Sequence, residues 1–215
     1  PAAALLRDAD RPPGTLFEPF GAGFLGRVMA TAEKPRKARL RYVLEALGGA
    51  FPQLRELQAH RDAQGRPHLR ALHQHWRPHG AWLGEQQLPD GALRLIALLW
   101  AALDGDGPLL LEEPELSVHP HAARMVPRML ARLGQRCSRQ VIFTTHSPDV
   151  LCGEEVSTSE IALLCPSEEG TLVRAALDLK EAVDLLDSGA LTAESGAAGE
   201  APAPERQLGL FGGPR

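Results

Sequence analysis

The residues best suited to chemistry are three glutamates that follow a short run of leucines. The run Leu109–Leu111 is followed by Glu112, Glu113, Pro114 and Glu115. Such a run is typical of a buried strand that the proline ends. A carboxylate at that end of a strand can hold a nucleotide-bound Mg²⁺, and its neighbour can orient or deprotonate an attacking water. A surface turn with scattered acids is the alternative, but acids rarely end a buried strand without a partner.

A histidine follows a second apolar run. Residues 140–145 are typical of a buried strand, and His146 comes directly after them. A helical pattern separates the two runs, so the unit is a strand–helix–strand crossover with parallel strands. His146 is then expected at the same edge of the sheet as Glu113. A neutral imidazole there can donate a hydrogen bond to a γ-phosphate or to a water, although an isolated histidine after a strand is more often structural.

The third segment is a turn that leads into a helix. It comprises Leu88, Pro89, Asp90 and Gly91, and the sequence that follows is strongly apolar. Backbone N–H groups at the start of a helix, with a glycine that allows close approach, form an anion site. Asp90 as an ordinary N-cap is the simpler interpretation of the same residues.

Apolar periodicity predicts the helices that surround these segments. Gly91 opens a helix that is apolar nearly all round, as a buried helix is. A second helix is expected to begin at Pro120 and end at Gly134. Pro127 lies inside this second helix and predicts a kink.

Composition divides the chain into three parts. Residues 1–85 are expected to form a small α+β lobe that includes a strand hairpin over 54–60 and 68–75. Residues 86–189 hold the strand–helix–strand unit, followed by a further hairpin and a short helix over 179–186. Residues 190–215 are rich in Ala, Gly, Pro, Glu and Ser, which is typical of a disordered tail.

Taken in this order and spacing, the three segments resemble the ABC/SMC/RecF-type ATPases. The resemblance is closer to bacterial AAA-type predicted ATPases related to OLD and RecF proteins. There the segments read like Ser-Asp-Gly-Thr-Leu-Arg, Glu-Glu-Pro-Glu and Thr-His-Ser-Pro. The resemblance covers about residues 86–150. It implies the carboxyl-terminal half of a P-loop NTPase-like α/β domain with parallel core strands, ATP and Mg²⁺ as cofactors, and a homodimer that sandwiches the nucleotide.

The resemblance also implies a role for each residue. Glu112 looks like the Walker B acid on the metal side, Glu113 like the catalytic base and His146 like the switch histidine. Ser117 begins the segment, up to His119, that would be the D-loop at a dimer interface. The signature that would contact the γ-phosphate in the partner subunit comprises Leu88, Asp90 and Gly91.

Two departures from the family pattern bear on activity. Pro89 stands where the family usually has serine, so a hydroxyl that would reach the γ-phosphate is missing. No G-x-x-x-x-G-K-S/T is present, because none of the three lysines follows a glycine. Without that phosphate-binding loop the chain should bind ATP poorly alone, so we expect a truncated or cleaved protein, or a partner chain that supplies the loop. The implied function is ATP hydrolysis coupled to DNA repair or defence; the alternative is a non-hydrolysing interaction module that keeps the fold.

Charge and cysteine content limit the partners and the compartment. The net charge is −4, which gives no global attraction to nucleic acid or to an anionic membrane. Three cysteines without C-x-x-C spacing, no secretory signal and no long apolar segment predict a soluble, cytoplasmic protein. One local basic run is either a solvated helix face or a DNA phosphate contact, and comprises Lys34, Arg36, Lys37, Arg39 and Arg41.

Two other patterns are weaker. Residues 21–26 fit G-x-G-x-x-G, but the preceding Pro-rich sequence is a poor strand and no matching acid follows. Four histidines, His68, His73, His75 and His79, could bind metal. No cysteine or carboxylate lies close to them in sequence, so we interpret them as exposed hairpin residues.

Overall fold

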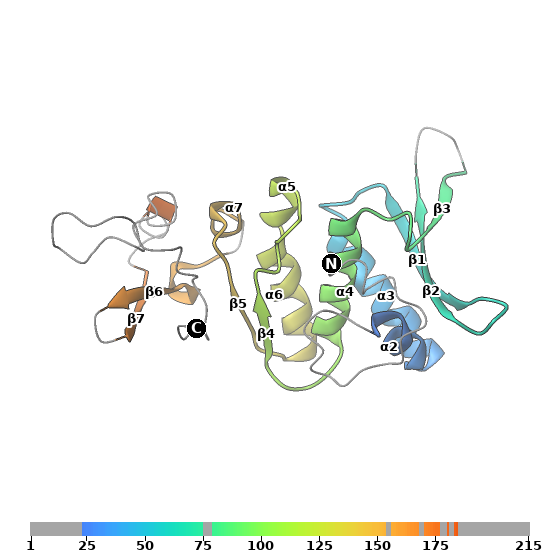
Figure 1. Cartoon of the computed structure of the whole chain (residues 1–215), viewed down its shortest axis with the longest axis horizontal. Coiled ribbons are helices and arrows are strands. Elements are labelled where there is room, and N and C mark those ends of the chain that lie inside the picture. The colour runs from blue at the N-terminus through green and yellow to red at the C-terminus, as the bar shows by residue number, and fades with distance from the viewer. Residues whose placement is uncertain are drawn as a thin grey trace.

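The computed structural model describes residues 23–74, 79–153, 156–167 and 170–176, together with Lys180, Val183 and Asp184. Helices and strands alternate along most of this length (Figure 1). The elements in chain order are α2 (Phe24–Ala30), α3 (Glu33–Leu47), β1 (Leu54–Arg61), β2 (Pro67–His73), β3 (Ala81–Gly84), α4 (Asp90–Leu103), β4 (Leu109–Glu112), α5 (Pro120–Ala123), α6 (Val126–Cys137), β5 (Val141–Thr144), α7 (Pro148–Leu151), the 3₁₀ turn Thr158–Glu160, β6 (Ala162–Ser167) and β7 (Gly170–Ala175).

The amino-terminal part of the described chain combines two helices with an antiparallel sheet of order β1–β2–β3. The predicted hairpin is confirmed, with Leu54 opposite His73 at one end and Arg61 opposite Pro67 at the other. At the turn, the carboxylate of Asp62 accepts hydrogen bonds from the backbone N–H groups of Gln64 at 2.9 Å and Arg66 at 2.8 Å. This Asx-type arrangement explains why the chain reverses there. The sequence patterns did not predict α2 or β3.

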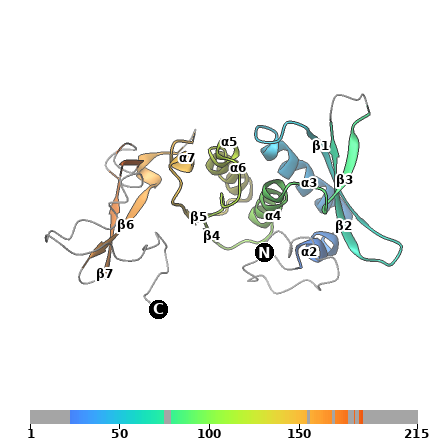
Figure 2. The same ribbon diagram turned by 45° about the horizontal axis from the view of Figure 1, so that its top comes forward.

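The central unit is the expected parallel pair. β4 lies beside β5 in parallel, with Leu109 opposite Val141 and Glu112 opposite Thr144. On one face of the pair, Leu109, Leu111 and the facing residues of β5 pack against the main core. Figures 1 and 2 both show helices α4 and α6 on this side, between the pair and the antiparallel sheet. The other face is open, because Leu110 in the middle of β4 is 54% exposed.

The predicted helix from Pro120 to Gly134 is instead two helices. α5 ends at Ala123 and α6 begins at Val126, with Pro127 in the first turn of α6. Proline lacks the backbone N–H that a continuous helix would use, whereas the first helical turn leaves that N–H unbonded. Instead of a kink at Pro127, the helix is therefore interrupted between Ala123 and Val126. α6 also runs past Gly134 to Cys137, because Ser138 supplies the left-handed residue that ends it.

One hydrophobic cluster joins the two parts. It contains residues of α2, α3 and the antiparallel sheet together with residues of α4 and α6, and Trp100 and Phe24 are its largest fully buried side chains. The boundary expected near residue 85 stays a prediction. The carboxyl-terminal hairpin is present as β6 and β7. The helix expected over 179–186 and the tail over 190–215 lie outside the described residues, apart from three positions in the helix.

Candidate nucleotide-hydrolysis site

The ends of β4 and β5 bring an acid and a histidine together. The Glu113 backbone N–H donates to the Thr144 carbonyl at 3.1 Å, which extends the parallel ladder past the last strand residue. His146 Nε2 then lies 3.6 Å from Glu113 Oε1. The two side chains are 34% and 25% exposed, so both remain accessible to a ligand in solvent. The sequence-based expectation that these two strand ends share one edge of the sheet agrees with this geometry.

Glu113 reaches this position through an unusual backbone conformation. Its φ is 43°, and Ser117 four residues later has φ 67°, so both occupy the left-handed region that non-glycine residues rarely adopt. Such a conformation costs on the order of 1 kcal/mol or more per residue and persists where the surroundings enforce it. Here two turns do so, with Leu116 N–H donating to Glu113 O at 3.0 Å and Val118 N–H to Glu115 O at 2.9 Å. Strained backbone of this kind is common at functional sites.

A buried carboxylate joins the same two loops. Glu115 is 8% exposed, and its Oε1 accepts a hydrogen bond from the Thr145 hydroxyl. The Thr145 oxygen in turn accepts the Ser147 backbone N–H at 3.0 Å, at the start of α7. The loop that carries His146 is thus tied to the loop that carries Glu113. Sequence reasoning noted Glu115 but gave it no role, because its partner lies 30 residues away.

Glu112 is the outermost residue of β4. It is exposed and lies on the same open face as Leu110, since strand residues alternate. Within the described residues there is no group of three or more His, Cys, Asp or Glu side chains placed to hold a metal ion. A single exposed carboxylate such as that of Glu112 suits Mg²⁺, because this ion usually takes one or two carboxylates from the protein and completes its shell with phosphate oxygens and waters.

The signature segment packs on the loop that follows β4. A Cβ added to Gly91 would lie 3.1 Å from the Ser117 carbonyl oxygen, and Arg94 Nη1 donates to Ser117 Oγ at 3.3 Å. Gly91 therefore allows close approach of two loops of one chain. Leu88 is 2% exposed, so its side chain belongs to the core and only its backbone can meet a ligand. Asp90 is exposed at the first turn of α4, where Pro89 rather than Asp90 is the N-cap.

Comparison with known proteins identifies the family. The family described as "AAA domain, putative AbiEii toxin, Type IV TA system" matches residues 24–152, which is more than half of the chain. The chain belongs to this AAA-domain family. The match contains α2 to α7, and so all the elements that carry Glu112, Glu113 and His146. An AAA-domain match agrees with the resemblance to AAA-type predicted ATPases that the three segments indicated.

Individual relatives agree with this assignment. The OLD nuclease of Thermus scotoductus is 40% identical over 42 residues, which cover 20% of this chain and 8% of the nuclease. An SMC ATPase, studied for ATP-driven dimerisation and DNA-stimulated activation, superimposes with a TM-score of 0.52 at 14% identity, covering 70% of this chain and 90% of that one. The Smc head domain of Pyrococcus yayanosii gives 0.52 at 13% identity, with 73% and 30% covered. The match thus spans less than a tenth of the curated relative, and the solved structures show the fold alone.

Only some of the cations in the basic run of α3, residues 34–41, are exposed to solvent. Arg36 Nη1 donates to the carbonyls of Met29 at 3.3 Å and Thr31 at 3.1 Å, at the end of α2. Arg39 pairs with Asp104 at 2.7 Å and lies over the Trp100 ring. These two arginines stabilise the packing of α3. The exposed cations of the run are Lys34, Lys37, which pairs with Glu33 at 2.5 Å, and Arg41.

The histidine interpretation needs a correction at His68. Its side chain is 24% exposed and its ring lies between two carboxylates, at 2.7 Å from Glu85 and 3.3 Å from Asp62. The hydrogen bond to Glu85, opposed by burial and assisted by Asp62, raises the pKa of His68. Burial works against ionisation of Asp62, but hydrogen bonds from Arg66 and His68 lower its pKa to about 2. The sequence distance from Glu85 concealed this contact. His75 lies outside the described residues.

None of the helices in the described part of the chain is both long and apolar enough to cross a lipid bilayer.

Proposed function

We propose that this AAA domain supplies one part of a composite ATP-hydrolysing site. Glu113 would orient or deprotonate the attacking water, and His146 would donate a hydrogen bond to the γ-phosphate or to that water. The single observation that carries the proposal is the 3.6 Å approach of Glu113 and His146 at the ends of two parallel strands. That edge of an open α/β sheet is where ligands bind.

Glu112 would hold Mg²⁺, directly or through water, at the outer end of β4. When bound, the ion would neutralise charge on the nucleotide phosphates. Glu112 suits this role because it is an exposed hard-oxygen donor on the open face of the pair. Glu113, one residue further and in the left-handed conformation, is directed to His146 instead. The two carboxylates can therefore serve different steps.

A composite site of this kind needs a phosphate-binding loop, and residues 1–215 contain no such motif. The open face of β4 and β5 fits this requirement, because Leu110 is 54% exposed where a parallel sheet is normally covered. We propose that the loop-bearing segment covers this face. In a homodimer, the signature residues Leu88, Asp90 and Gly91, with Ser117, would contact the nucleotide bound by the partner subunit.

Hydrolysis would be coupled to DNA in repair or defence, as proposed from the resemblance. Two relatives support this direction: one is named a nuclease, and another is an SMC ATPase with DNA-stimulated activation. Lys34, Lys37 and Arg41 remain candidates for contact with phosphates, because they are exposed on α3.

A non-hydrolysing module is the second candidate. The observation that favours it is Pro89, which caps α4 without a side-chain hydrogen bond where the family usually has serine. A dimer with no serine hydroxyl at this point would contact the γ-phosphate less well.

ATP turnover by the chain, combined with the segment that supplies the phosphate-binding loop, separates the two candidates. We expect Glu113→Gln to lower kcat by about 10²–10⁴-fold, the usual contribution of a general base, while nucleotide binding persists. Glu56→Gln on β1 is the matched control, since Glu56 is exposed and distant in the fold. Turnover that is equal in wild type and Glu113→Gln would contradict the enzymatic role. Inactivity of both proteins, with ATP still bound, would favour the module.

A further inference from the structure

The longest acid-free part of the central sequence is strongly basic. Residues 116–148 contain no Asp or Glu but five arginines, at positions 124, 128, 132, 136 and 139, in a chain whose net charge is −4. Arg124 pairs with Asp149 at 2.8 Å. Arg139 donates to the carbonyls of Ala101 and Asp104 beneath the end of α4. These two arginines serve the fold, and the other three lie on α6.

The three arginines of α6 share one face of the helix. Arg128, Arg132 and Arg136 are spaced by four residues, so they form a row about 12 Å long at 1.5 Å per residue. The opposite face of α6 is buried in the core. Like charges four residues apart repel one another and slightly destabilise a helix. An anionic partner that lies along such a row would relieve this repulsion.

Helix α3 extends the basic face. Arg136 lies over the Tyr42 ring at 3.4 Å from its centroid, and Arg41 approaches the same ring at 5.3 Å. Stacking on an aromatic ring holds a guanidinium in a defined plane. The acid that α3 places near this face, Glu45, is exposed and 3.7 Å from Arg41, a weak surface pair.

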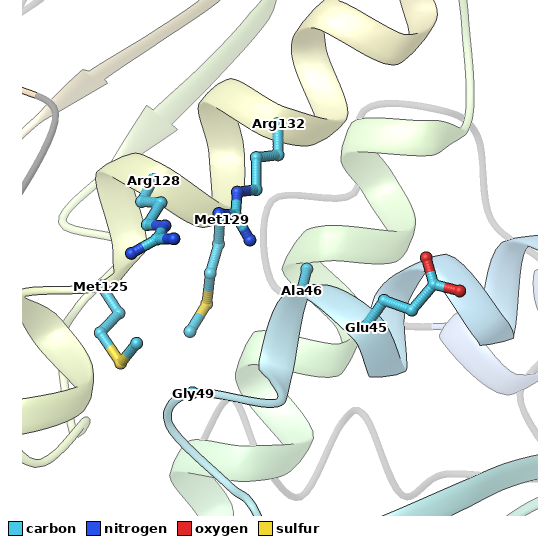
Figure 3. A pocket seen from close by; sticks show the side chains of 7 residues that line it. All are labelled: Glu45, Ala46, Gly49, Met125, Arg128, Met129 and Arg132. Carbon is cyan, nitrogen blue, oxygen red and sulfur yellow. The ribbon is translucent and has the colours of Figure 1, made fainter.

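A hollow of about 180 Å³ lies between the two helices, at the amino-terminal half of the row. Figure 3 shows Met125, which precedes α6, and Met129 of α6 turned toward the loop with Gly49 that follows α3, with Arg128 and Arg132 extending from the same helix. The two arginines border a recess rather than a flat surface. Glu45 lines the same recess and the Nε of Arg128 is buried, whereas Arg132 is exposed. Arg132 is therefore the arginine of the recess that phosphate groups can approach from outside the helix.

The face lacks the features of a protein-binding site. Interfaces between proteins depend on exposed apolar or aromatic anchors. The large exposed hydrophobic side chains of the described chain are Trp82, Leu110, Leu116, Leu172 and Val173, and none lies on α3 or α6. A nucleic-acid backbone needs only regularly placed cations, and arginine is well suited to bind phosphate.

We propose that Arg132 and Arg136 of α6, with Arg41 and Tyr42 of α3, contact the phosphate backbone of duplex DNA without reading its sequence. This inference gives a surface to the proposed coupling to DNA, but it does not require ATP hydrolysis. It moves the principal contact from the basic run of α3, where Arg36 and Arg39 stabilise the fold, to α6.

Fluorescence anisotropy with a labelled duplex of about 30 base pairs and mixed sequence, without nucleotide, tests the proposal. Each phosphate contact contributes about 0.9 to the slope of log K against log[salt]. The double variant Arg132→Gln/Arg136→Gln should therefore flatten the slope by about 1.8 and weaken binding by about 10- to 100-fold at 50 mM salt. Arg132→Lys/Arg136→Lys keeps both charges and should retain most of the slope.

The control is Arg55→Gln/Arg61→Gln, which removes the same charge from exposed positions of β1. This control should bind DNA with nearly the wild-type slope. Equal losses in both double variants would mean that net charge alone matters, and would overturn the proposal. An unchanged affinity and slope in the α6 variant, or a wild type that binds a labelled polyglutamate peptide but no duplex, would overturn it as well. Because no ATP is present, none of these outcomes depends on the proposed ATPase.

Discussion

Replacing Thr145 by valine tests whether a buried hydrogen-bond network holds together the loops that carry Glu113 and His146. The Thr145 hydroxyl donates to Glu115, which is 8% exposed, and accepts the Ser147 amide at 3.0 Å. Valine has nearly the same shape, so it removes these hydrogen bonds without opening a cavity. The neighbouring Thr144 offers a matched control, because its hydroxyl is buried and has no hydrogen-bond partner within the described chain.

The expected losses follow from the two hydrogen bonds. A bond to a buried carboxylate contributes about 1.5–3 kcal/mol and an ordinary bond about 0.5–1.5 kcal/mol. Thr145→Val should therefore lower the free energy of unfolding by about 2–4 kcal/mol, since it also leaves Glu115 buried without its donor. Thr144→Val replaces an unsatisfied hydroxyl by a methyl group. Its effect should lie between zero and a gain of about 1 kcal/mol.

Urea unfolding of both variants, followed by far-ultraviolet circular dichroism at constant pH, measures the two differences. A double-mutant cycle with Glu115→Leu, which removes the acceptor, assigns the loss to the pair, and we expect a coupling of about 1 kcal/mol or more. If Thr145→Val is as stable as wild type within about 0.5 kcal/mol, or if Thr144→Val loses as much stability as Thr145→Val, the network does not stabilise the two loops.

Two further substitutions test contacts that the fold creates. Gly91→Ala should lower stability by about 1 kcal/mol despite alanine's higher helix propensity, because its Cβ would lie 3.1 Å from the carbonyl of Ser117. Gly84→Ala should not lower stability through a clash, because the space around Gly84 is open. A Gly91→Ala variant with the same thermal midpoint as wild type would refute this packing role. The raised pKa of His68, caused first by Glu85, means that folding favours the protonated ring. Its contribution is complete below about pH 6.5 and is lost as the pH rises through the raised pKa. His68→Gln should thus flatten the decline in stability above about pH 6.5, and an unchanged profile in urea unfolding would exclude this cause.

The sequence by itself determined the elements whose signals are local. The apolar run before Glu112 and the one before His146 are short and bounded, and a helical pattern of suitable length separates them. Those features predict a strand–helix–strand crossover with a parallel pair, which places Glu113 and His146 at the same edge of the sheet. The motif order also indicated an AAA-type family, and the match over residues 24–152 is to an AAA domain.

Tertiary structure decided everything that depends on partners distant in the sequence. The pairing of Glu115 with Thr145 spans 30 residues, and the contact of His68 with Glu85 spans 17. Arg39 pairs with Asp104, which is 65 residues away in the sequence. The basic run of α3 therefore contains arginines that stabilise the fold as well as cations that are exposed to solvent. The same side chain costs or contributes free energy according to what surrounds it. Spacing along the chain reports secondary structure, whereas burial and charge pairing exist only once the helices and strands have packed.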